Sequence, residues 1–407
     1  MPQKIYQILL YVLLISFMVW ELSPLPMSLS MIGLVALGLY MGHWEAFVER
    51  FKFQKLYVAL FLYFSFAVLS FFWTEDTALY LKKLQLYLPM LILPFAFNLL
   101  PPIEGKMWRN LLKFFVLLMV VAMLGTLINY WFFHYQEYNL ELARSGNIKT
   151  PIHHIRFSLL AAFAACVAAY LSKCSLLNRS AKAPLWLLAF GLLVLGVHIL
   201  GVRSGLLGLY LSLSAYLVIE IFNAKAYRLG LGIMAFGLLT VVLAYNYSPT
   251  LKIKISLSKH NYHEYMAGRI GNYSDTRRYV SYQVGIETGN QSPWIGQGLG
   301  DADSIFIRKF RAVSPKSMPI LPHNQFIYVY GLLGLVGLLL LLFVCLSPII
   351  QYPPLKNPLF FSFQLIAISS FMTETTLETQ VGLSFYLTFN LLFIQSQLSV
   401  SKNKTMA

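Results

Sequence analysis

The feature that most constrains this chain is a succession of apolar blocks, most of them long enough to cross a lipid bilayer. The 407-residue sequence is 58% hydrophobic and only 12% charged, whereas soluble domains have about 25% charged residues. A helix needs about 20 apolar residues to span the hydrocarbon core. The blocks lie at residues 5–22, 27–42, 56–72, 79–98, 110–133, 155–172, 184–200, 204–222, 229–247, 325–346, 358–374 and 381–396. We therefore predict an all-α polytopic membrane protein of about 12 transmembrane helices in a single membrane domain.

Charge and cysteine usage argue against other classes of protein. The formal charge of +15 could indicate nucleic acid, but the basic residues are dispersed among hydrophobic blocks. Lys4 alone precedes the first block and no small-residue cleavage site follows it, so we interpret that block as a span and not a signal peptide. Cys166, Cys174 and Cys345 fall in or beside spans, where we expect apolar filling and no disulfide framework.

The connections between the blocks alternate in their content of Lys and Arg. The basic set comprises Lys4; Arg50, Lys52 and Lys55; Lys106, Arg109 and Lys113; Lys173, Arg179 and Lys182; Lys225 and Arg228; Lys356; and Lys402 and Lys404. Three short connections of the other set, 21–26, 73–77 and 374–380, contain no Lys or Arg. Because basic connections stay in the cytoplasm, we predict that both termini are cytoplasmic, which for a bacterium means a protein of the inner membrane.

A hydrophilic loop at 248–324, between the ninth and tenth spans, is then outside the membrane, which for a bacterium means the periplasm. It contains ten Lys or Arg and five Asp or Glu, and it is too long to be a simple connector. Within it we predict a helix at 276–288, with Ser274 or Asp275 as its N-cap and Gly289 closing it. Gly296, Gly298 and Gly300 are interpreted as turn residues, since no strand–turn–helix unit surrounds them to suggest a nucleotide site.

Two arginines could bind an anion at the outer face. Arg203 lies between two glycines at the outer end of a predicted span, where it could contact lipid headgroups or hold a phosphate. Arg277 and Arg278 lie in the first turn of the loop helix, either as a solvated pair or as ligands of an anion at the helix N-terminus. Arg278 shares a face with Tyr282 and Ile286, so we favour Arg278 as the inward-facing residue.

Histidines mark the outer starts of two other spans. His323, with Asn324 beside it, precedes the span at 325–346. The helix dipole there disfavours imidazolium, and a neutral ring suits a general base; a structural role at the headgroups is the alternative. His154 and Arg156 begin the span at 155–172 together with His153. We predict that His154 and Arg156 line a substrate site and bind no metal, since no carboxylate follows at metal-ligand spacing.

These residues together resemble the bacterial O-antigen ligase and O-antigen polymerase superfamily. The resemblance is carried by Arg203-Ser204-Gly205, Arg278 with Tyr282, the segment Pro293 to Gly300, His323-Asn324 with Gly331 to Gly334 behind it, Trp73 to Asp76, and Glu374 with Glu378. It extends over about 60–396 and is strongest over 200–340. The chain has Val202 where the family often has Ser, and the doubled Arg277-Arg278 leaves the register open by one residue.

The resemblance implies a C-type glycosyltransferase that takes a glycan from undecaprenyl diphosphate. A ligase transfers it to a lipid A–core sugar hydroxyl, with inversion and without metal or other cofactor. Arg203 and Arg278 would hold the diphosphate, His323 would act on the acceptor hydroxyl, and Arg277, Arg156, His154, Asn324 and Tyr282 would line the substrate site. A polymerase would use the same site with a second lipid-linked glycan. A lipid-linked glycan transporter is the alternative from another class, but charged residues in mid-span are nearly absent.

Overall fold

The computed structural model describes residues 2–42, 44–133, 148–225 and 274–405, together with short pieces of 256–267. All regular elements in these stretches are helical. The α-helices are α1 Pro2–Val19, α2 Leu25–Met41, α3 Phe47–Phe53, α4 Lys55–Leu69, α5 Thr77–Tyr87, α6 Pro89–Leu99, α7 Gly105–Ile128, α9 His154–Leu177, α10 Ala183–Leu200, α11 Arg203–Ala224, α14 Ser274–Gln291, α15 Ala302–Val313, α16 Gln325–Gln351, α17 Pro358–Thr373 and α18 Gln380–Thr405. Short turns of other helix types are η1 Trp44–Ala46, η2 Ser70–Trp73, η3 Asn129–Phe133 and η4 Thr376–Glu378.

Eight helices of the described residues are long and apolar enough to cross a membrane. They are the helices expected from eight of the predicted spans, so the all-helical polytopic class is supported. The spans at 27–42 and 358–374 correspond to α2 and α17, which are apolar but shorter, at 17 and 16 residues. The predicted span at 229–247 lies outside the described residues, as does the start of the loop at 248. The total of about 12 therefore stays a prediction.

The predicted helix at 79–98 is wrong as a single element. It divides into α5 and α6 at Leu88, directly before Pro89. Proline has no N–H to donate to the preceding turn and its ring crowds the carbonyl four residues earlier, so the hydrogen-bond ladder breaks there.

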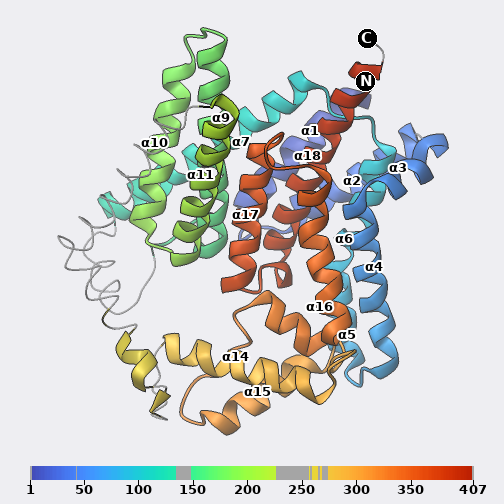
Figure 1. The fold of residues 1–407 in the computed structure, drawn as a ribbon, viewed down its shortest axis with the longest axis vertical. Coiled ribbons are helices and arrows are strands. Elements are labelled where there is room, and N and C mark those ends of the chain that lie inside the picture. Colours follow the sequence, from blue (N-terminus) through green and yellow to red (C-terminus); the bar gives the residue numbers. More distant parts are fainter. Residues whose placement is uncertain are drawn as a thin grey trace.

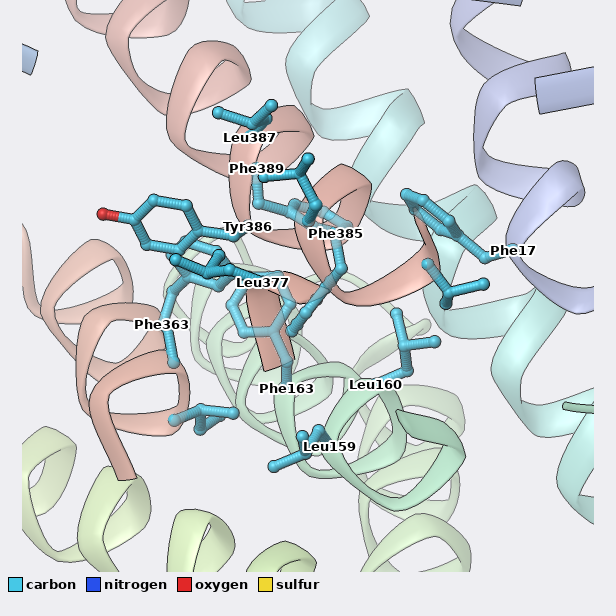
Figure 2. Close-up of a cluster of buried hydrophobic side chains, with 14 of the residues drawn as sticks. Phe17, Leu159, Leu160, Phe163, Phe363, Leu377, Phe385, Tyr386, Leu387 and Phe389 are labelled. Atoms are coloured by element: carbon cyan, nitrogen blue, oxygen red, sulfur yellow. The ribbon is translucent and has the colours of Figure 1, made fainter. Parts of the chain in front are cut away.

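The centre of the bundle is aromatic. Phe163 of α9, Phe363 of α17 and Phe389 of α18 pack together (Figure 2), with ring centroids 5.0 Å apart for Phe163 and Phe363 and 4.8 Å apart for Phe163 and Phe389. On α9 a series of small residues is fully buried: Ala161, Ala162, Ala164, Ala165 and Ala168. Small side chains let helix backbones approach closely, which is what drives packing where lipid removes the hydrophobic contribution.

The helices α14 and α15 lie across one end of the bundle, whereas the start of α1 and the end of α18 lie at the other end (Figure 1). The helix predicted at 276–288 is confirmed as α14, but it already includes Ser274 and Asp275 and continues to Gln291. Gly289 therefore does not close it. A Cβ at Gly289 would lie 2.3 Å from the ring of Tyr330, so this glycine allows α14 to pack closely on α16.

The segment 293–300 fills a break in α16. Gly334 has φ +62° and interrupts the helix. The amides of Gln297 and Gly298 donate to the carbonyls of Gly331 and Leu332, and the amides of Leu335 and Val336 donate to the carbonyls of Pro293 and Trp294. The polar backbone groups freed by the break are thus paired within the protein, as a site at membrane depth requires. Gly296 and Gly298, at φ +71° and +94°, confirm the predicted turn residues.

The connection after α4 is fixed to the same segment. Both carboxylate oxygens of Asp301 accept backbone amides, from Glu75 and from Asp76, each at 2.8 Å. A Cβ at Gly300 would lie 2.2 Å from the carbonyl oxygen of Asp76. The Trp73–Asp76 and Pro293–Gly300 motifs therefore form one structural unit, which attaches the outer loop to the bundle.

Candidate active site

The N-terminal end of α16 is built around Asn324. Its side-chain oxygen accepts the amides of Phe326 and Ile327 at 3.0 and 3.1 Å, which is the usual N-cap arrangement. Its side-chain nitrogen donates to the carbonyl of Met372, at the end of α17. His323 directly precedes this cap, as predicted, and its carbonyl accepts the hydroxyl of Tyr282 at 3.1 Å. The cap therefore fixes His323 between α14 and α17.

Glu374 is the acidic residue on which the candidate site converges. One carboxylate oxygen lies 3.0 Å from Nδ1 of His323, and the other accepts Nη2 of Arg278 at 3.4 Å. Its side chain is only 7% exposed. The contact joins the end of α17 to the loop helix α14 and to the start of α16. The bundle thereby brings together Arg278 and His323, two of the predicted catalytic residues.

The charge state of Glu374 follows from these contacts. Burial alone would raise the pKa of its carboxyl group. The hydrogen bond with His323 and the guanidinium charges of Arg278 and Arg156 outweigh burial and lower that pKa below its usual value. Glu374 is therefore an ionised acceptor at neutral pH. This carboxylate supports a proton on Nδ1 of His323, so that Nε2 is left as the acceptor nitrogen.

The start of α9 contributes a second group of side chains. Nη1 of Arg156 lies 3.0 Å from Nδ1 of His153, and the rings of His153 and His154 have centroids 4.4 Å apart. Burial, Arg156 and His154 lower the pKa of His153 to about 4, so its ring is neutral at physiological pH. Among the described residues no three His, Cys, Asp or Glu side chains form a metal-binding group.

Arg203 begins α11 and pairs with the loop helix. Its Nη1 lies 2.9 Å from Oδ1 of Asp275, and its side chain is 64% exposed. Asp275 lies one turn before Arg278 on α14. The pair therefore places Arg203 and Arg278 at the same end of the loop helix, although one comes from a membrane helix.

The side chain of Arg277 does not join the contacts around Glu374. Its Nε donates to the carbonyl of Met318, in the connection between α15 and α16. The structure thus places Arg278, and not its neighbour, against Glu374. The sequence motifs included Glu374, but we did not predict its place in the site. The sequence feature that could have predicted this role is that Glu374 is an acidic residue in the connection 374–380, which contains no Lys or Arg.

Residues 188–342 of the sequence match the protein-family model described as O-antigen ligase. No curated protein matches the chain. The matched range includes Arg203, Arg278 and His323, and it ends before Glu374. Residues 188–342 therefore match the O-antigen ligase family, and the expected resemblance to the O-antigen ligase and polymerase superfamily is confirmed over this range.

Proposed function

We propose that this protein is an O-antigen ligase that transfers a glycan from undecaprenyl diphosphate to a sugar hydroxyl of lipid A–core. The reaction takes place at the periplasmic face of the inner membrane. The observation that carries the proposal is the convergence of Arg278 and His323 on Glu374, beside Arg203 and Arg156. Arg203, Arg278 and His323 lie within the residues that match the O-antigen ligase family, whereas Arg156 and Glu374 lie outside them. Together these residues form a cationic cluster next to a histidine that can act as a base.

The chemistry needs both parts of this cluster. The acceptor oxygen forms a bond to the anomeric carbon from the face opposite the diphosphate, while the bond from that carbon to the diphosphate oxygen breaks. The electron pair leaves with the diphosphate, and Nε2 of His323 takes the hydroxyl proton. Arg203 and Arg278 stabilise the charge that develops on the leaving group. No metal takes part in this scheme.

The cluster contains more positive than negative charge. Arg156, Arg203 and Arg278 supply three guanidinium groups, whereas Asp275 and Glu374 supply two carboxylates. A diphosphate that enters would give Arg203 a doubly charged partner in place of Asp275. Arginine suits this exchange because its planar fork binds phosphate oxygens in pairs.

The other predicted residues take supporting roles. Both polar atoms of the Asn324 side chain are used in the helix cap and the contact with Met372, so Asn324 positions His323. Tyr282 does the same through the His323 carbonyl. His154 and Arg156 would contact the sugar or the diphosphate from α9, and Arg277 would bind the donor near Met318.

The test is complementation of a deletion strain with Arg203→Ala, Arg278→Ala and His323→Ala, using Arg311→Ala as control. Arg311 is an exposed arginine of the same loop, at the end of α15. Loss of one transition-state charge contact lowers the rate by about 10²–10³, so either arginine variant should nearly abolish transfer. Arg311→Ala should restore it.

Lipopolysaccharide gels distinguish the outcomes. Core without O-chain, with long glycan still on the lipid carrier, supports a ligase. Core capped with one repeat assigns the chain to a polymerase instead. Loss of lipid-linked glycan translocation in inverted vesicles, with transfer intact, would assign it to a transporter. If all three site variants complement normally, the proposed site is wrong.

A further inference from the structure

A cavity of about 790 Å³ lies apart from the arginine cluster. Helices α2, α5 and α6 form most of its wall, and Asp303 of α15, Tyr328 of α16 and Glu378 of η4 close one end. None of Arg156, Arg203, Arg278 and His323 lines it. The proposed reaction has two lipid-linked substrates, and the arginine cluster accounts for the diphosphate of only one.

The wall on the membrane helices is apolar. Met31 and Ile32 of α2 and Ile92 of α6 line it, and the side chain of Ile32 is 60% exposed. Because α2 corresponds to a predicted span, we infer that this wall opens toward the acyl region of the bilayer. This wall suits alkyl chains that enter sideways.

The end of the cavity at Asp303, Tyr328 and Glu378 is polar, and its side chains are held by hydrogen bonds and an ion pair. Nζ of Lys83 lies 2.8 Å from Asp303 and 2.7 Å from the hydroxyl of Tyr328, which itself donates to Asp303 at 2.7 Å. Glu378 accepts the hydroxyl of Tyr87 at 2.5 Å and Nε2 of Gln325 at 3.0 Å. Both carboxylates retain lone pairs that could accept further hydroxyl groups.

One lysine at the rim is not compensated. Lys82 is exposed and lines the cavity, and no ion pair engages it within the described residues. An ammonium group of this kind suits a phosphate. A bare phosphate would be repelled by Asp303 and Glu378, but sugar hydroxyls would donate to these carboxylates. The cavity therefore offers apolar side chains for acyl chains, carboxylates for sugar hydroxyls and an ammonium group for a phosphate.

We propose that this cavity binds the acceptor of the transfer, a phosphorylated glycolipid, with its acyl chains against α2 and its sugar toward Glu378. The proposal rests on the proposed function. The segment 321–325 connects the cavity to the candidate base. Leu321 lines the cavity, His323 contacts Glu374, and Gln325 bonds to Glu378 and to the amide of Leu377. An acceptor sugar in the cavity thus lies next to the segment that holds His323.

The experiment uses the full chain with p-benzoylphenylalanine at Ile32, and at Leu81 as the matched control. Leu81 lies on α5 beside Lys82, is also 60% exposed and does not line the cavity. The protein is reconstituted in vesicles of phosphatidylethanolamine and phosphatidylglycerol that contain tritiated lipid A–core. We expect at least fivefold more label at Ile32 than at Leu81, and competition by unlabelled lipid A–core.

A second set of vesicles carries tritiated phosphatidylglycerol instead. Equal labelling of Ile32 by both lipids would show an ordinary bilayer-lipid site and overturn the proposal, as would equal labelling of Ile32 and Leu81 by the glycolipid. Transfer by the wild-type protein is measured in the same vesicles. Activity without selective labelling rejects only the cavity, whereas selective labelling without transfer rejects only the proposed reaction.

A kinetic test follows from the same geometry. Ile32→Trp should fill the apolar wall and raise the KM for lipid A–core at least fivefold, with the KM for the diphosphate donor unchanged. Leu81→Trp should change neither value. An equal increase for both substrates in Ile32→Trp would contradict a site for the acceptor alone.

Discussion

At the scale of single residues, Glu374 organises the candidate site. It holds an arginine and a histidine that lie 96 and 51 positions away in the chain, and its side chain is almost fully buried. A buried carboxylate is tolerated only where cations and hydrogen bonds compensate it. Removing its charge should therefore disturb Arg278 and His323 together.

Glu374→Gln should lower the rate of transfer by about 10²-fold, which is the usual effect of losing a group that takes part in general acid–base catalysis. The amide cannot neutralise Arg278 and cannot support the Nδ1 tautomer of His323 as a carboxylate does. Initial rates of transfer at neutral pH measure this effect.

Glu287→Gln is the control for that substitution, because Glu287 is exposed on α14 and its carboxylate accepts the side-chain amide of Gln283 one turn earlier. Glu374→Asp should recover part of the rate. A Glu374→Gln enzyme with the wild-type rate would remove Glu374 from the site.

The lowered pKa of Glu374 also predicts how stability depends on pH. A carboxyl whose pKa is lower in the folded protein contributes stability above its unfolded pKa, about 4.3, and loses it as the pH falls through the folded value. The difference in melting temperature between wild type and Glu374→Gln should thus be constant from about pH 7 to 5.5 and shrink at lower pH. A difference that grows on acidification would contradict the assigned charge.

At the scale of elements, the least regular part of α16 depends on glycine. Gly334 has φ +62°, and a Cβ there would lie 2.4 Å from the carbonyl carbon of Trp294. Gly334→Ala should destabilise the protein by about 1–3 kcal/mol from backbone strain alone, and more if segment 293–300 is displaced. Thermal unfolding in detergent, followed by tryptophan fluorescence, measures the loss.

Gly191→Ala is the matched control. Gly191 lies inside α10, and nothing lies within 4 Å of the position that an alanine methyl group would take. The substitution should therefore stabilise the helix by about 0.5–1 kcal/mol. Equal melting temperatures for the Gly191 and Gly334 variants would show that the break in α16 tolerates a side chain.

The sequence predicts some elements and contacts better than others. A run of apolar residues is a local pattern, and it predicts a span. The spacing of Arg278, Tyr282 and Ile286 is also local, and it predicts that these residues share one face of α14. The break at Pro89 had a local signal that the long apolar run obscured. Gly334 lies within an apolar run that a continuous helix would also show. The pairs that Glu374 makes depend on the packing of α14, α16 and α17, which no local pattern encodes.

At the scale of the whole molecule, the loop helices are fixed to the bundle. Asp301 holds the connection after α4, and Asp303 forms a buried ion pair with Lys83 of α5. Breaking one partner of a buried pair typically costs about 3–5 kcal/mol. The candidate site therefore requires that α14 and α15 lie on one side of the membrane together with the starts of α9 and α11.

That requirement can be tested through the orientation of the chain. Asn178 is exposed in the turn after α9, at the end opposite His154, beside Lys173, Arg179 and Lys182. Basic turns stay in the cytoplasm, so this end should be inside and Lys316, exposed after α15, should be outside. In a Cys174→Ala background, a membrane-impermeant maleimide should label Lys316→Cys in intact spheroplasts and Asn178→Cys only after permeabilisation.

The remaining thiols do not complicate that measurement, because Cys166 and Cys345 are buried. The two labelling sites lie at opposite ends of the helices, so they must report opposite sides in either orientation. Labelling of Asn178→Cys alone in intact spheroplasts would place the arginine cluster in the cytoplasm, away from the periplasmic acceptor. Such a result would exclude the proposed transfer while leaving the fold intact, because the packing of α14 on α16 is the same in both orientations.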